Sequence, residues 1–161
     1  MNAMDLAMQM EKDGEIFYRH LADKTTNPGL RNILGLLSAD EAKHYQALQK
    51  MKESFKAELV STPILSKSKN IFQLLREEKN WEAPPAGQVD LYRKARDIET
   101  QSFNFYMEKA RESGDPKTQK LFFLIAEEEK RHEFLVEHLL QFVSRPQTWL
   151  ENAEFNHLDQ Y

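Results

Sequence analysis

The sequence predicts an all-α protein, built as an antiparallel four-helix bundle with a long crossover between its second and third helices and a short C-terminal helix. Only 5 glycines and 6 prolines occur in 161 residues, and 30% of the residues are charged, a composition typical of soluble helical proteins. Four long stretches place apolar residues at helical spacing. The length suits one domain with a real core, so we expect a single domain over residues 1–161.

The first two helices are expected to form a hairpin. They run from about Met4 to Lys24 and from about Leu30 to Phe55, with Thr26-Asn-Pro-Gly29 between them. These residue types favour a turn, and Pro suits the first turn of a helix. A connection this short makes the two helices antiparallel neighbours.

The second hairpin follows the same plan. Its helices are expected at about Val89–Glu112 and Pro116–Val143, separated by Gly114-Asp-Pro116. The longer segment Glu58–Gln88 joins the two hairpins and contains a short amphipathic piece, Ile71–Arg76. A crossover of this length lets both hairpins lie side by side. After Arg145-Pro146, Thr148–Leu158 is expected to form the short C-terminal helix.

The two hairpins match each other when the chain is shifted by 88 residues. Residues 3–50 then align with residues 91–138 without a gap, and identical polar residues and tyrosines fall at matching places. The identities include Glu11 with Glu99, Tyr18 with Tyr106, Glu41 with Glu129 and His44 with His132. We interpret this pattern as an internal duplication.

Helical geometry directs one glutamate of each helix, and one histidine of each hairpin, toward the core. At about 100° per residue, Glu129 and His132 fall on the apolar stripe centred on Ile125, whereas His138 falls on the far side. The same construction on all four helices gives an inward set of Glu11, Glu41, His44, Glu99, Glu129 and His132. Asp40 and Glu128 lie at the stripe edges, where they would either orient a histidine across the bundle or face solvent.

Four carboxylates that meet in an apolar core repel each other and lose their hydration, at a cost of several kcal/mol per ion. Two imidazoles do not offset that charge, but two divalent cations do. Carboxylate and imidazole ligands suit iron, manganese or zinc. Four Glu and two His in a helical bundle form the ligand set of a carboxylate-bridged dinuclear site.

At this point the chain resembles a known family. Glu11 with Tyr18, Glu41-Ala-Lys-His44, Glu99 with Tyr106, and Glu129-Lys-Arg-His132 are similar to the ferritin-like superfamily, in particular its rubrerythrin-like di-iron branch. The resemblance implies two iron ions per chain, with manganese or zinc as alternatives. It also implies that Glu41 and Glu129 bridge the metals, that Glu11 and Glu99 are terminal ligands, and that His44 and His132 each bind one metal. Tyr18 and Tyr106 would hydrogen-bond within the site, in a redox role or through core packing alone.

The chain departs from that family in two respects. Rubrerythrins carry a Cys-rich electron-transfer domain, whereas this chain has no cysteine, so an external protein is expected to donate the electrons. Their third helix also has an extra glutamate one turn after the terminal ligand, at the position of Ser102 here. Glu15 is a candidate seventh ligand from the first helix. A further Glu-x-x-His, Glu154 to His157, lies outside the repeat and is interpreted as structural or partner-facing.

The leading functional hypothesis is a dinuclear-iron oxidoreductase that reduces peroxide or dioxygen. The alternatives are a ferroxidase or iron-storage protein, and a metal-binding bundle without redox activity. A net charge of −4 argues against a nucleic-acid partner, and no apolar run is long enough to span a membrane. The first residues do not resemble a signal peptide, so a cytoplasmic location is expected. The expected apolar surface is larger than one bundle can hide, so we predict a homodimer. This surface comprises Trp81, Trp149 and the Phe-rich faces of the third and fourth helices, with Phe103, Phe105, Phe122 and Phe123.

Overall fold

The computed structural model confirms the all-helical bundle. It describes residues 2–54, 59, 64–65, 68, 71, 77 and 84–144. The long helices in this part of the chain are α1 (Ala3–Lys24), α2 (Pro28–Ser54), α4 (Ala86–Glu112) and α5 (Pro116–Ser144). The C-terminal helix expected at 148–158, and most of the piece expected at 71–76, lie outside the described residues.

Both hairpin turns place an Asn or Asp directly before a Pro, and these two residues start the next helix. The side-chain oxygens of Asn27 and Asp115 each accept a hydrogen bond from the backbone N–H three residues later, at 3.1 and 3.0 Å. Pro28 and Pro116 are the first helical residues, at a position where a backbone N–H is not needed. The turn residues therefore define the starts of α2 and α5.

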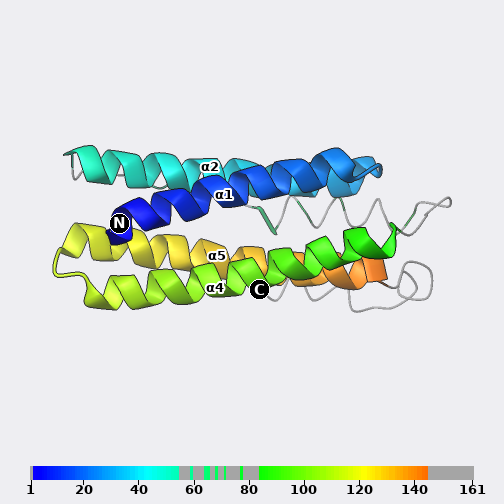
Figure 1. Ribbon diagram of the computed structural model, residues 1–161. Coiled ribbons are helices and arrows are strands. Elements are labelled where there is room, and N and C mark those ends of the chain that lie inside the picture. Colours follow the sequence, from blue (N-terminus) through cyan, green and yellow to red (C-terminus); the bar gives the residue numbers. More distant parts are fainter. Residues whose placement is uncertain are drawn as a thin grey trace.

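The two hairpins lie side by side (Figure 1), with α1 and α2 forming one layer and α4 and α5 the other. Contacts are densest within each hairpin, and the hairpins meet through α1 with α4 and through α2 with α5. In the part of the chain that the structure describes, no helix has both the length and the apolar character needed to cross a membrane.

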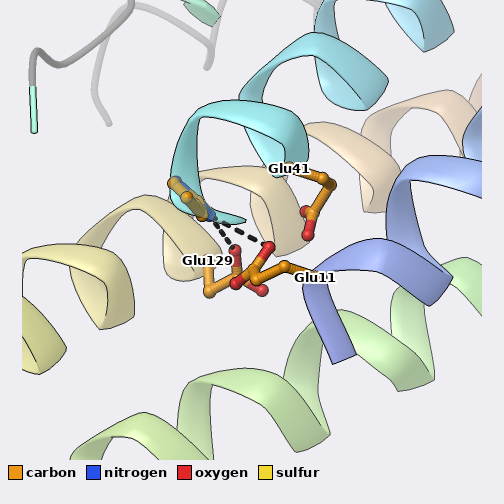
Figure 2. Close-up of side chains that lie close together, drawn as sticks. Glu11, Glu41 and Glu129 are labelled. Carbon is orange, nitrogen blue, oxygen red and sulfur yellow. Dashed lines mark hydrogen bonds and ion pairs between the residues drawn. The ribbon is translucent and has the colours of Figure 1, made fainter. Parts of the chain in front are cut away.

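The middle of the bundle is acidic. Carboxylates of Glu11, Glu41 and Glu129, from α1, α2 and α5, point toward one another between the helices (Figure 2). Glu99 from α4 is buried as well, at 1% exposure. Each helix therefore interrupts its apolar stripe with one inward glutamate near its centre.

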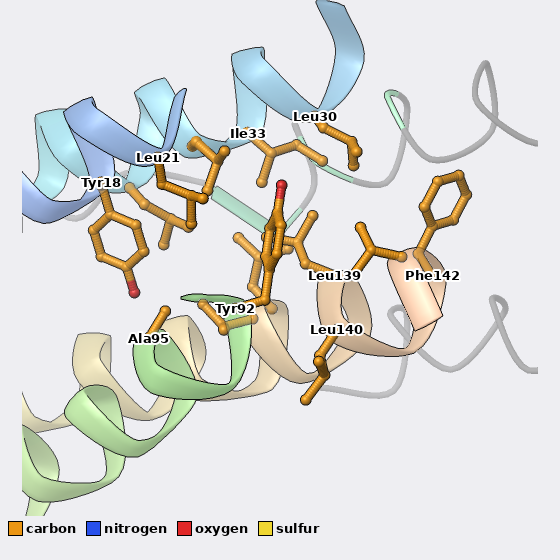
Figure 3. Packing of buried hydrophobic residues seen from close by; sticks show 14 of the residues in the cluster. Tyr18, Leu21, Leu30, Ile33, Tyr92, Ala95, Leu139, Leu140 and Phe142 are labelled. Atoms are coloured by element: carbon orange, nitrogen blue, oxygen red, sulfur yellow. The ribbon is translucent and has the colours of Figure 1, made fainter. Parts of the chain in front are cut away.

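Apolar packing closes the bundle on both sides of this acidic layer. One cluster contains Tyr18, Leu37, Ala95 and Leu135, and the other contains Ala7, Leu48, Tyr106 and Ile125. In the first cluster, Tyr92 stands between the hairpins with its hydroxyl directed toward α1 and α2 (Figure 3), 3.4 Å from the Thr25 hydroxyl. Burial of these side chains, at about 25 cal/mol per Å², holds the four glutamates together against their repulsion.

Candidate metal centre

The six inward side chains converge in the middle of the bundle. All are buried, with exposures between 0 and 4%. They form two overlapping groups, Glu11–Glu41–His44–Glu129 and Glu41–Glu99–Glu129–His132, and in each group one ligand atom from every residue lies within 4.8 Å of the others. Glu41 and Glu129 belong to both groups. This arrangement offers two neighbouring cation positions that share two carboxylates.

Each histidine presents Nδ1 to the carboxylates. His44 Nδ1 lies 3.3 Å from Glu11 Oε2 and 3.1 Å from Glu129 Oε1. His132 Nδ1 lies 3.2 Å from Glu41 Oε1 and 3.5 Å from Glu99 Oε1. The two rings are nearly parallel, with centroids 5.8 Å apart. Each imidazole can therefore donate its Nδ1 lone pair to a different cation position.

The opposite nitrogen of each ring faces an acid from the other hairpin. His132 Nε2 lies 2.9 Å from Asp40 Oδ2, and His44 Nε2 lies 3.4 Å from Glu128 Oε1. Both acids are buried, at 1 and 6% exposure, which resolves the alternatives left open by their places at the stripe edges. A carboxylate at Nε2 favours the tautomer that leaves Nδ1 free for a metal.

The two tyrosines also reach across the bundle. Tyr18 donates a hydrogen bond to Glu99 Oε1 at 2.5 Å, and Tyr106 donates one to Glu11 Oε1 at 2.7 Å. Burial, followed by the charge of the accepting glutamate, raises the pKa of both phenols well above its usual value. Tyr18 and Tyr106 therefore remain protonated donors that orient Glu99 and Glu11.

Burial and mutual repulsion disfavour the ionised form of the two shared glutamates. Burial raises the pKa of Glu41 well above its usual value, and the charges of Glu11 and Glu129 raise it further. Burial, together with the charge of Glu99, does the same to the pKa of Glu129. The two shared glutamates are therefore the two whose negative charge is hardest to keep without cations.

The pKa values of His44, His132 and Glu11 are shifted by the same crowding. Burial alone would lower the pKa of His44 and of His132. The nearby carboxylates outweigh this effect, chiefly Glu11 for His44 and Glu99 for His132, so that both pKa values lie well above the usual one. For Glu11, the upward effect of burial is outweighed by His44 and by hydrogen bonds, so its pKa falls. In the absence of cations, protons bound to the glutamates and histidines reduce the excess of negative charge in the centre.

The donor atoms fit divalent metal ions. Glu99 Oε2 is fully buried and has no hydrogen-bond partner, and Glu129 Oε1 meets the ring nitrogens of His44 and His132 at 3.1 and 3.7 Å without hydrogen-bond geometry. This is a costly arrangement for buried carboxylates. Metal ligation would occupy these lone pairs. Oxygen and imidazole donors are those that iron, manganese and zinc accept, so the residues present fit such an ion at each position.

Glu15 behaves differently from the six. Its carboxylate pairs with two exposed cations, Arg19 at 2.7 Å and Lys12 at 3.5 Å. Neither of the two groups of converging ligand atoms includes it. Glu154 and His157 lie outside the described residues.

The fold and the centre together define a ferritin-like four-helix bundle with a buried carboxylate–histidine group able to hold metal. The family model described as Rubrerythrin matches residues 2–140. Since this match covers most of the chain, the protein belongs to the rubrerythrin family. Comparison with curated proteins and with solved structures found no match.

Proposed function

We propose that this protein is a dinuclear-iron oxidoreductase that reduces peroxide or dioxygen. The observation that carries the proposal is the sharing of Glu41 and Glu129 by two complete groups of ligands. One group alone would favour a mononuclear site. Two groups joined through carboxylates favour a pair of ions close enough to act on one small oxidant.

Charge supports a pair of ions rather than one. The four glutamates carry four negative charges when ionised, and two divalent ions balance them. The pKa values of Glu41 and Glu129 are raised largely by burial and by the other carboxylates. Two cations bound among these carboxylates would offset that repulsion, so ionisation of all four acids would become favourable.

A bound iron pair would supply the two electrons that reduction of peroxide requires. The residues of the chain have distinct parts in this proposal. Glu41 and Glu129 would each contribute to both metal positions, which Glu11 with His44 and Glu99 with His132 would complete. The phenol protons of Tyr18 and Tyr106 keep Glu99 and Glu11 oriented. The apolar clusters at either end keep bulk water out of the centre.

The electrons are proposed to come from another protein. The sequence contains no cysteine, so it offers no thiolate ligands for an iron–sulfur or rubredoxin-type electron carrier. A homodimer is part of the proposal too. Phe103, Phe105 and Phe123 are only partly buried, and Leu6 and Leu124 are exposed. Phe122 adds nothing to this surface, because it is buried in the core at 3% exposure. Trp81 and Trp149 lie outside the described residues.

Metal analysis combined with reactivity tests the proposal. Protein purified without added metal is expected to contain about two iron ions per chain, and the anaerobically reduced protein should be reoxidised by hydrogen peroxide. A centre filled with zinc, or inert toward both peroxide and dioxygen, would contradict the redox assignment. Sedimentation distinguishes the ferroxidase and storage alternative, since storage requires a hollow shell of many subunits rather than a dimer.

A further inference from the structure

Gly14 lies in α1, one turn after Glu11, directly against the carboxylate of Glu41. A β-carbon built at Gly14 would stand 3.0 Å from Glu41 Oε2 and 3.3 Å from Glu41 Cδ. At Gly35, Gly87 and Gly114 the same construction meets nothing within 4 Å. Gly14 is also buried in the middle of a helix, where glycine is less favourable than alanine. Its place beside a buried carboxylate gives that unfavourable choice a reason.

The two oxygens of Glu41 face different parts of the centre. Oε1 lies 3.2 Å from His132 Nδ1, within the group that contains Glu99. Oε2 is the Glu41 atom that a β-carbon at Gly14 would meet first, so it faces α1, the helix that also carries Glu11. Oε2 therefore belongs to the side of the centre that contains Glu11 and His44.

The equivalent position in the second hairpin is not a glycine. The shift of 88 residues places Gly14 on Ser102, which is buried with 7% of its surface exposed. The second hairpin therefore accommodates a β-carbon and a hydroxyl at the place where the first has neither. Only the first hairpin therefore lacks a side chain at this position beside the centre.

We propose that Gly14 is a positioning residue whose missing side chain lets Glu41 Oε2 reach the cation position formed with Glu11 and His44. With a β-carbon at this place, the carboxylate must turn or withdraw. Glu41 would then keep its contact at the His132 position and lose its reach to the other. The inference rests on the proposed metal pair, because Glu41 can act as a bridge only if both of its oxygens are placed.

Gly14→Ala is the direct test, with Gly35→Ala as the matched control because it makes the same change on an open helix surface. Metal-free full-length protein is titrated with Co²⁺ in competition with a chelator, and binding is followed by visible absorption. Wild type and Gly35→Ala are expected to take two ions. Gly14→Ala is expected to keep one binding step and to weaken the other by about tenfold or more.

Two results of the titration would overturn the role of Gly14: two unchanged binding steps in Gly14→Ala, or an equal weakening of both steps. A wild type that binds fewer than two ions refutes the proposed function instead. A measurement without metal then decides the contact between Gly14 and Glu41. Thermal unfolding of the metal-free protein should show Gly14→Ala less stable than Gly35→Ala.

Glu41→Asp supplies the rescue, since it shortens the side chain by one methylene and withdraws the carboxylate from the new β-carbon. In the Gly14→Ala background it should recover part of the lost melting temperature. The double variant also decides the outcome if Gly14→Ala alone does not fold. Recovery of a folded protein supports the steric contact, whereas no recovery contradicts it.

Discussion

His132 in α5 contacts Asp40 in α2 through its outer nitrogen, with 2.9 Å between Nε2 and Oδ2. The two residues come from different hairpins, and both are almost fully buried. The contact fixes the ring so that Nδ1 faces the carboxylates. His44 has the corresponding contact with Glu128, but at 3.4 Å and without hydrogen-bond geometry. The orientation of His132 is therefore fixed by a closer acid than the orientation of His44.

Asp40→Asn should weaken the binding of one metal ion by about tenfold. The substitution keeps the shape of the side chain but removes the charge that makes the His132 imidazole a stronger ligand. Glu128→Gln, the matched change at the longer contact, should have a smaller effect. Chelator-competition titrations of both variants with Zn²⁺ measure the difference. Equal losses of affinity in the two variants would show that the distance between the acid and the histidine Nε2 does not determine how much the acid strengthens metal binding.

Glu41→Gln and Glu129→Gln should each abolish loading with two metal ions and yet stabilise the metal-free protein at neutral pH. Each change removes a carboxylate that is proposed to bridge the metals and whose ionisation is opposed by burial and by neighbouring acids. The metal-free variants should unfold at a higher denaturant concentration than the wild type, because a glutamine at either position needs no proton to remain neutral when buried.

Elemental analysis and chemical unfolding of the metal-free proteins measure the two effects of these changes. Glu15→Gln is the control, since its carboxylate pairs with exposed cations, and it should change neither quantity. Full dinuclear loading of Glu41→Gln or Glu129→Gln would refute the bridging assignment.

Tyr18→Phe should destabilise the metal-free protein more than Tyr106→Phe does. Tyr18 donates a hydrogen bond to Glu99 Oε1; without it Glu99 keeps only the longer contact with His132 Nδ1, at 3.5 Å, and its Oε2 has no hydrogen-bond partner. Glu11 keeps His44 at 3.3 Å after the loss of Tyr106. An unsatisfied buried acceptor costs about 1–3 kcal/mol. Thermal unfolding measures the order, and added metal should reduce the difference because ligation satisfies Glu99.

The helices and the inward residues could be predicted because both depend on periodicity along one helix. Apolar spacing and the turn residues before Pro28 and Pro116 place the hairpins. The angle per residue is enough to direct Glu41 and Glu129 inward. The third helix begins at Ala86 instead of Val89, because its first turn precedes the apolar stripe.

Relationships between helices could not be predicted in the same way. Nothing in the sequence shows that Tyr18 donates to Glu99 of the other hairpin, because the register of two hairpins depends on packing in three dimensions. The projection places His138 on the far side of its helix from the apolar stripe, and the side chain is nevertheless only 8% exposed. The ring of Phe134, one turn earlier on the same helix, lies 4.5 Å from its imidazole. A helical projection gives the direction of a side chain but not the bulk of its neighbours.

The pH dependence of stability follows from the pKa shifts in the metal-free protein. Glu41 and Glu129 have pKa values raised above 4.5, and His44 and His132 have values raised above 6.5. A group whose pKa is raised by folding stabilises the fold fully below its unfolded pKa, and this stabilisation is lost as the pH rises through the folded value. Glu11, with a lowered pKa, acts in the opposite direction, but only around and below pH 4.5.

The metal-free protein should therefore lose stability as the pH rises from about 5 to 9, because the four buried groups keep their protons to a higher pH than the same groups do in the unfolded chain. Metal should reverse this trend, since deprotonated carboxylates and imidazoles are the ligands and protons compete with the ion. Chemical unfolding across this pH range, with a chelator and with excess Zn²⁺, measures both curves. Glu129→Gln should flatten the metal-free curve. A metal-free protein whose stability rises toward pH 9 would show that the acids do not share a buried charge.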